Sequence, residues 1–334
     1  MKREEFRIQM GFARCALRVA AFLLLCGIPC ANAYAEESAV PKRKTHVALR
    51  HSETFGHKGS GAGEFLHPHD VAIDPSGNIL VADTGNHRIV KLNAKGSYLT
   101  EVGGFGWDDR QFNEPSGVST GTGLEIYVSD QENQRVALYS QHLKLISIVG
   151  GRDVGGALAM GKVGGVATTR EGEIYVTDQD LDQVIQVSTF SRTDRSFGGY
   201  GYGSGELRAP SAVDVDMEGR VYVCDTENDR VAVFDRFGNY ERELGAEVLT
   251  RPEGVVAGPS GVLFVSDTGS HRVLAFDVDK DEVVGRMGGP KRGTGPGQFD
   301  TPRGLTFDLR SNVLLVVDSG NHRLQKFKTL ILKK

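Results

Sequence analysis

The segment ILVADTGNHR at residues 79–88 recurs in six versions along the chain, and the spacing of these versions decides the fold. The other five are IYVSDQENQR at 126–135, IYVTDQDLDQ at 174–183, VYVCDTENDR at 221–230, LFVSDTGSHR at 263–272 and LLVVDSGNHR at 314–323. Their central aspartates are 47, 48, 47, 42 and 51 residues apart. A repeat of this length indicates an array of supersecondary units, and for β-rich units it is typical of a propeller.

Each repeat contains four short strand patterns, as residues 70–104 illustrate. DVAID at 70–74 alternates apolar and polar residues, whereas ILVAD at 79–83 is continuously apolar, as in a strand covered on both faces. RIVKLN at 88–93 and YLTEVGG at 98–104 follow, and turn-forming residues separate the strands. Four antiparallel strands form one blade, so we predict an all-β, six-bladed propeller with four-stranded antiparallel blades.

The N-terminal strand is predicted to close the ring. The sixth repeat supplies three strand patterns, GLTFD, NVLLVVD and RLQKFKTL, and ends without a fourth. HVALRHSETFG at 46–56 precedes the first repeat and has a strand pattern, so we expect residues 46–55 to complete blade six and cover open strand edges. We therefore predict a flexible leader at 36–45, a single propeller domain at 46–328 and a short tail at 329–334.

The repeats resemble the NHL repeat, which is named after an Asn-His-containing turn. GNHR at 85–88 and at 320–323 matches that pattern, and the resemblance covers roughly residues 46–328. Gly-rich loops such as GSGAGEF at 59–65 recur between the repeats, and a proline usually begins the next inner strand. The third repeat departs most, because it lacks this proline and has Leu181 and Gln183 where Asn and Arg are expected.

Residues 1–35 are predicted to be a signal peptide, with either Met1 or Met10 as the start. Arg14 and Arg18 precede the apolar run VAAFLLLCGI at 19–28, and a small-x-small cleavage site lies at 33–35. The apolar run is too short to span a bilayer comfortably. We therefore expect an exported protein, periplasmic or extracellular, with no transmembrane segment after signal removal.

Cleavage there would leave an acidic chain with one cysteine. The complete chain has 39 Lys and Arg against 43 Asp and Glu, and residues 1–35 hold five and two of these, so 34 face 41 and the formal charge is −7. Phosphate binding needs a basic face, so nucleic acid is disfavoured as a partner. Cys224 is expected to be a small buried residue, and we expect a monomer.

The aspartate of each repeat and the arginine five residues later recur too often to be catalytic. We expect them to be structural, with the aspartate satisfying turn amides and facing the arginine across the turn. These residues are Asp83, Arg88, Asp130, Arg135, Asp178, Asp225, Arg230, Asp267, Arg272, Asp318 and Arg323.

The residues that follow the inner-strand prolines are the candidate ligand-binding residues. In propellers of this type they lie at the mouth of the central channel, and here they are His69, Ser116, Gly164, Ser211, Glu253 and Arg303, with His67 and Asp70 flanking. Polar groups that converge on one concavity mark the usual place for a ligand. We predict a site built from His69, Asp70, Ser211, Glu253 and Arg303; the alternative is that Glu253 and Arg303 only pair with each other at the rim.

The function expected from this pattern is binding, of a protein or a small ligand, and no catalytic residue is identified. PHDVAID at 68–74 also resembles the zinc-binding motif of peptidyl-α-hydroxyglycine α-amidating lyase, which implies a metal-dependent lyase or hydrolase as the alternative. That enzyme takes zinc ligands from three such motifs, whereas this chain has one, at His69. DVDKDE at 277–282 resembles the start of a calcium loop but lacks its later Gly and Glu, which favours a solvated hairpin tip. We expect no cofactor, with zinc and calcium as alternatives.

Overall fold

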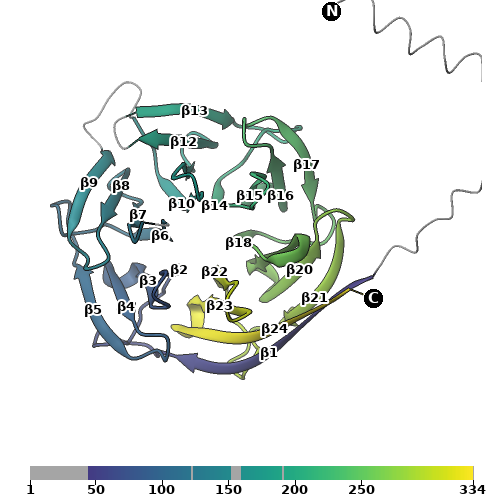
Figure 1. Ribbon diagram of the computed structural model, residues 1–334, viewed down its shortest axis with the longest axis horizontal. Helices are drawn as coiled ribbons and strands as arrows, with labels where there is room; N and C mark the ends of the chain where they lie inside the picture. Colours follow the sequence, from purple (N-terminus) through teal and green to yellow (C-terminus); the bar gives the residue numbers. More distant parts are fainter. Residues whose placement is uncertain (1–43, 122, 152–158, 190–191, 334) are drawn as a thin grey trace, which may run out of the picture. The chain divides into compact units, whose positions relative to one another are not determined.

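The strand patterns of the six repeats form six four-stranded antiparallel sheets arranged around a central channel (Figure 1). This computed structural model describes residues 44–121, 123–151, 159–189 and 192–333, and the predicted signal peptide lies outside them. The predicted fold class, an all-β six-bladed propeller, is confirmed. Within the described residues, no helix has the length and apolarity needed to cross a membrane.

The blades follow one another along the chain, each from its inner to its outer strand. Blade one contains β2 (Asp70–Ile73), β3 (Ile79–Asp83), β4 (Arg88–Leu92) and β5 (Tyr98–Gly103). Blade two contains β6 (Pro115–Thr120), β7 (Ile126–Asp130), β8 (Arg135–Tyr139) and β9 (Leu145–Gly150). Blade three contains β10 (Val163–Thr168), β11 (Ile174–Asp178), β12 (Gln183–Thr189) and β13 (Arg192–Gly198). Blade four contains β14 (Pro210–Val215), β15 (Val221–Asp225), β16 (Arg230–Phe234) and β17 (Tyr240–Leu244). Blade five contains β18 (Pro252–Ala257), β19 (Val262–Asp267), β20 (Arg272–Asp277) and β21 (Glu282–Gly288). Blade six contains β22 (Pro302–Asp308), β23 (Val313–Asp318), β24 (Arg323–Lys333) and β1 (Thr45–Phe55).

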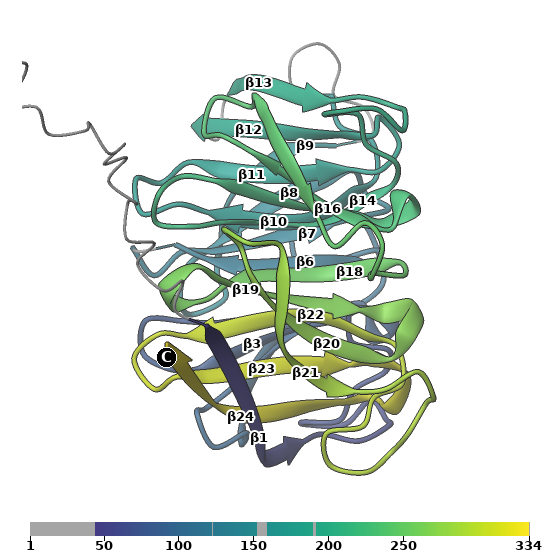
Figure 2. The ribbon, with the colours of Figure 1, turned by 90° about the vertical axis from the view of Figure 1, so that its right-hand side faces the viewer.

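The N-terminal strand β1 closes the ring as predicted, because it pairs antiparallel with β24 as the outer strand of blade six. The pairing extends further than the sequence suggested. Residues 45–49 pair with residues 329–333, so the segment predicted as a tail belongs to this ribbon. Figure 2 shows β1 beside β24. The ribbon that these two strands form also reaches blade five, since Thr45 Oγ1 donates to Asp277 Oδ2 at 2.7 Å. Closure therefore joins two blades.

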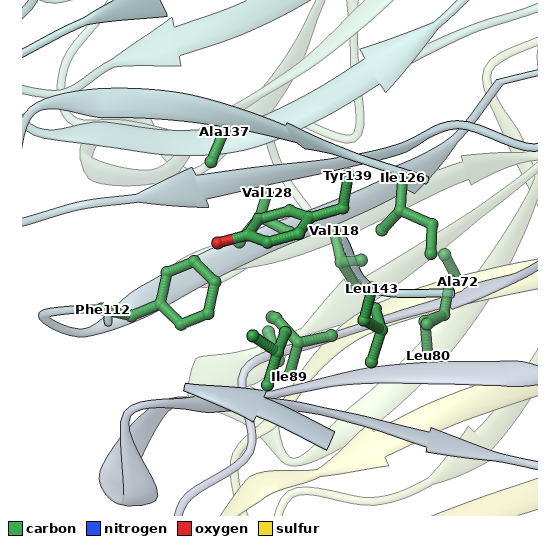
Figure 3. Close-up of a cluster of buried hydrophobic side chains, with 12 residues drawn as sticks. Ala72, Leu80, Ile89, Phe112, Val118, Ile126, Val128, Ala137, Tyr139 and Leu143 are labelled. Atoms are coloured by element: carbon green, nitrogen blue, oxygen red, sulfur yellow. The ribbon is translucent and has the colours of Figure 1, made fainter. Parts of the chain in front are cut away.

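The hydrophobic core is divided among the interfaces between neighbouring blades. Figure 3 shows the interface of blades one and two, where Leu80 and Ile89 from blade one pack with Phe112 and Tyr139. All four side chains are completely buried. Burying one large apolar side chain stabilises a fold by about 1.5–3 kcal/mol, so these contacts fix the angle between adjacent blades.

In blades one, two, four, five and six, the repeat aspartate and arginine join the blade to the loop that precedes it. In blade one, Asp83 Oδ1 accepts a hydrogen bond from Leu66 N at 2.7 Å, and Asp83 Oδ2 accepts one from Arg88 Nε at 2.8 Å. Arg88 Nη2 donates to the carbonyl oxygens of Gly61 and Glu64. Equivalent aspartate–arginine pairs lie in four further blades: Asp130–Arg135, Asp225–Arg230, Asp267–Arg272 and Asp318–Arg323. In the third repeat Asp178 accepts only backbone N–H groups in their place, from residues 161, 180 and 181.

In blades one, three, four, five and six, the turn after the repeat aspartate links neighbouring blades through one side chain whose backbone is in the left-handed conformation. His87, His271 and His322 have φ angles of 54°, 51° and 55°, a region in which His, Asn and Asp are enriched. Their Nδ1 atoms accept hydrogen bonds from the backbone N–H groups of Glu114, Thr301 and His67 in the next blade, at 3.1, 3.0 and 3.0 Å. Asp182 and Asp229 make the same link to Ala209 and Arg251. These links hold the residues that directly precede the inner strands, and so they shape the channel mouth.

Candidate binding site at the channel mouth

The inner strands begin around one opening of the central channel, and a hollow of about 650 Å³ lies there. Its lining comes from the starts of the inner strands and from the turns after the repeat aspartates. The lining residues are His67, His69, Thr84, Gly85, His87, Glu114, Gln131, Gln179, Ala209, Ser211, Thr226, Glu227, Arg251, Glu253, Thr301, Arg303 and Ser319. None of these carries a large apolar side chain, so the hollow offers hydrogen bonds and charges.

Four of the five predicted site residues line this hollow: His69, Ser211, Glu253 and Arg303. The fifth, Asp70, lies further inside the channel, in a hollow of about 340 Å³. Ser116, which was expected at the mouth, is buried and faces blade three, where its Oγ donates to the carbonyl oxygens of Val163 and Gly164 at 2.9 and 3.0 Å.

Glu253 lies between two guanidinium groups. Arg303 Nη1 is 2.8 Å from Glu253 Oε2, and Arg251 Nη2 is 3.7 Å from Oε1. The rim pairing considered from the sequence therefore forms. It leaves 31% of the Arg303 side chain exposed, while Glu253 is 9% exposed. Arg303 can thus donate to an anion or a hydroxyl in the hollow while Glu253 holds its position.

His69 is neutral at physiological pH in this environment. Burial disfavours the imidazolium, the positive charge of Arg303 disfavours it further, and together they lower the pKa of His69 to about 3. A neutral imidazole has one donor and one acceptor nitrogen. His69 is therefore suited to hydrogen bonding with a polar ligand and adds no charge to the mouth.

Asp70 joins the inner strands of blades one and two. Its Oδ2 accepts a hydrogen bond from Val118 N at 2.9 Å and its Oδ1 one from Val71 N at 2.8 Å. Burial raises the pKa of Asp70 to about 7. Asp214 makes a similar link from blade four to Ala257 N of blade five, at 2.7 Å, and burial raises its pKa to about 6. Both carboxyl groups line the channel interior behind the mouth.

Several lining residues were not predicted, and they come from the turns after the repeat aspartates. In three blades the first turn residue is a threonine that donates to the carbonyl of the proline beginning the next inner strand: Thr84 to Pro115, Thr226 to Pro252 and Thr268 to Pro302. Of these threonines, Thr84 and Thr226 line the hollow. Blades two and three have Gln131 and Gln179 at this position, and these amides bond to each other at 3.0 Å. This change from threonine to glutamine is visible in the sequence and could have indicated them.

At the mouth, His69 is the one candidate zinc ligand that the sequence suggested. Across the described ranges, no three His, Cys, Asp or Glu side chains lie close enough together to hold a metal ion. A catalytic zinc site takes three protein ligands, whereas His69 is a single candidate ligand. The calcium-like segment 277–282 forms the turn between β20 and β21, where Asp277 Oδ2 accepts from Lys280 Nζ at 2.7 Å.

A second hollow, of about 890 Å³, lies where the inner strands of blades three to five end. Its charged side chains largely serve local contacts: Arg220 pairs with Asp216 at 2.7 Å, and Arg195 donates to the carbonyl of Phe237 at 2.9 Å. Arg170 and Arg236 also line it. The mouth hollow differs from this second hollow because side chains of different chemistry, at equivalent positions of separate blades, come together there.

Comparison with known proteins agrees with this architecture. The family model for the NHL repeat matches residues 65–92, 207–234, 249–276 and 299–327, which lie in blades one, four, five and six. The chain is thus a six-bladed β-propeller, and four of its repeats match the NHL repeat. Blades two and three, which the family model does not match, are those with Gln131 and Gln179 at the mouth.

Among curated proteins, the chain is 25% identical over 288 residues to NHL repeat-containing protein 2 of Gallus gallus and 26% identical over 290 residues to that of Homo sapiens. Each match covers 78% of this chain but only 38% of the relative's length. A shorter match, 35% identical over 89 residues, covers 25% of this chain and 25% of a Caenorhabditis elegans protein described as a probable peptidyl-alpha-hydroxyglycine alpha-amidating lyase.

Solved structures with the same fold include virginiamycin B lyase from Staphylococcus aureus, with a TM-score of 0.58 and 11% identity, covering 85% of this chain and 99% of that one. Another is an auxiliary nutrient binding protein from Bacteroides ovatus, with a TM-score of 0.61 and 12% identity, covering 86% and 77%. At these identities the likeness concerns the fold alone.

Proposed function

We propose that this chain is an exported binding or scaffold module, periplasmic or extracellular, that holds a ligand or protein partner at the channel-mouth face. It acts as a monomer and needs no cofactor. The fold is a common scaffold for binding, but fold alone does not define function, so the proposal rests on the site.

One observation carries the proposal. His69 of blade one, Ser211 of blade four, Glu253 of blade five and Arg303 of blade six line a single hollow. These four residues occupy equivalent positions in their blades, yet they differ in chemistry, whereas the residues that maintain the repeat are uniform. A concavity with a few convergent polar groups is the usual form of a ligand site.

The test is a thermal-shift ligand screen on the wild type, repeated on His69→Ala combined with Arg303→Ala. The matched control combines Arg170→Ala with Arg236→Ala, which removes two arginines from the second hollow. A ligand of the mouth should bind at least about tenfold more weakly to the first variant, a loss of about 1.4 kcal/mol, and with unchanged affinity to the control. If the mouth variant binds as tightly as the wild type, the mouth is not the site.

A metal-dependent lyase or hydrolase at the mouth is the second candidate, and the 89-residue match to the Caenorhabditis elegans protein favours it. Metal analysis of the purified chain separates the two candidates. About one zinc ion per chain, lost in His69→Ala, would support the lyase. Ligand binding by metal-free wild type, with affinity unchanged when zinc is added, supports the binding module.

A further inference from the structure

Four large aromatic side chains are exposed on two loops that join neighbouring blades. Phe105 and Trp107 are 63% and 73% exposed, and Tyr200 and Tyr202 are 68% and 67% exposed. They come from the segments GFGW and GYGY, in which a glycine precedes each aromatic residue. Because these rings lack the cover that large aromatic residues usually have, they are available as contact surfaces for another molecule.

Both loops lie on the same face as the mouth, because each runs from the end of an outer strand to the start of the next inner strand. The contacts agree. The ring of Phe105 lies edge-on to His87, with centroids 5.1 Å apart. Arg208 stacks on Tyr202, with its Cζ 4.7 Å from the ring centroid, and pairs with Glu227 at 2.7 Å. His87 and Glu227 both line the mouth hollow, so the aromatic loops continue its surface on two sides.

The combined surface defines the chemistry of a ligand. The hollow presents hydrogen-bonding side chains such as Gln131, Gln179 and His69, and it has no apolar pocket for an anchoring side chain of a peptide. The glutamates lining it, Glu114, Glu227 and Glu253, are not outnumbered by its arginines, which disfavours a nucleic acid. A molecule with many hydroxyl groups and apolar C–H faces satisfies both the polar hollow and the exposed rings.

We propose that the mouth hollow and the two aromatic loops together bind a neutral oligosaccharide. Sugar rings stack on Trp107 and Tyr202, and their hydroxyl groups bond to the polar side chains of the hollow. This inference rests on the proposed function and specifies its ligand class.

Trp107 allows a direct test, because it is the only tryptophan in the sequence. The full chain is titrated with hexasaccharides of β-1,4-linked glucose, α-1,4-linked glucose, β-1,4-linked xylose and β-1,4-linked N-acetylglucosamine, and the tryptophan emission is recorded. Stacking of a sugar on this exposed ring should give a saturable change in the emission intensity and a shift of the emission to shorter wavelength with at least one of the hexasaccharides. A proline-rich decapeptide is titrated in parallel as the peptide probe.

Variants then locate the contact. Tyr202→Ala and, separately, Arg303→Gln should each weaken the bound hexasaccharide at least about fivefold, roughly 1 kcal/mol. Phe237→Ala is the matched control: Phe237 is 56% exposed and lines the second hollow, so its loss should leave the affinity unchanged. Calorimetry with Trp107→Ala gives the contribution of that ring.

Three results would overturn the proposal. The first is no saturable change with any hexasaccharide at about 10 mM, well above a millimolar Kd. The second is binding of the decapeptide alone. The third is hexasaccharide binding that Tyr202→Ala and Arg303→Gln leave intact. The first two results concern the ligand class only; the proposed function fails separately, if ligands found in the screen bind normally to the combined His69→Ala and Arg303→Ala variant.

Discussion

Replacing Asp83 with alanine tests the structural role of the repeat aspartate. The carboxylate is fully buried and accepts hydrogen bonds from Leu66 N, Asn86 Nδ2 and Arg88 Nε. The substitution removes these acceptors at once and leaves the Arg88 guanidinium, only 8% exposed, without its buried partner. Asp83 does not line the mouth hollow, so this variant should lose stability but keep its affinity for a ligand of the mouth.

The structure sets the size of the effect. Leaving buried turn donors without an acceptor would by itself cost about 1–3 kcal/mol. Removing one partner of a buried ion pair costs about 3–5 kcal/mol. Arg88 keeps its bonds to Gly61 and Glu64, and Nη1 keeps Glu101 at 2.9 Å, so we expect the lower end, about 3 kcal/mol. That is a large share of a typical domain stability of ~5–15 kcal/mol.

Urea denaturation followed by circular dichroism measures the loss. Asp235→Ala is the control, because Asp235 accepts backbone bonds from Phe237 and Asn239 in an exposed turn and should cost under about 1 kcal/mol. A loss of under about 1 kcal/mol for Asp83→Ala would refute the reasoning. So would a folded Asp83→Ala protein that no longer binds a ligand found in the screen.

Three further predictions concern closure and pH. Deleting residues 36–56 removes β1 and should lower the free energy of unfolding by several kcal/mol, and deleting 329–334 should cost less but measurably; an unchanged melting curve for the first deletion would contradict ring closure. Because burial raises the pKa of Asp70 to about 7, against about 3.9 in the unfolded chain, the folded state holds that proton more tightly, so stability falls as pH rises from about 4 to 7. Asp70→Ala should flatten this fall in denaturation curves across that range, and an unaltered slope would oppose the assignment. Burial and the nearby His67 and Lys58 lower the pKa of His322, so its contribution to the stability of the fold is lost as pH drops below about 6.5. His322→Ala should remove that loss of stability, and the same loss below about pH 6.5 in the variant would argue against this assignment.

The fold was predictable from the sequence because its determinants are local and repeated. The spacing of Asp83, Asp130 and their equivalents reports the blade length, and the apolar segments before them report buried strands. Closure by residues 46–55 followed from a missing fourth strand in the last repeat. The extension of β24 to Lys333 was missed, since it depends on pairing with residues 45–49, which lie almost the full chain length away.

The candidate site was only partly predictable. His69, Ser211, Glu253 and Arg303 could be found because they share one position in the repeat. Asp70 was placed with them on sequence proximity, but in a strand successive side chains point to different faces, and it lies deeper in the channel. Gln131 and Gln179 reach the mouth from the turns. Their replacement of threonine is visible in the sequence, but the bond between their amides depends on how neighbouring blades pack.

Hydrogen-exchange mass spectrometry of the wild type, with and without a ligand identified in the screen, tests the binding face most directly. If the mouth binds the ligand, protection should appear in residues 66–70, 84–88, 250–253 and 300–304, which surround the opening. Residues 169–173, 216–220 and 258–262, which border the second hollow, should exchange at the same rate with and without ligand. Protection confined to this second set would contradict a channel-mouth binding site.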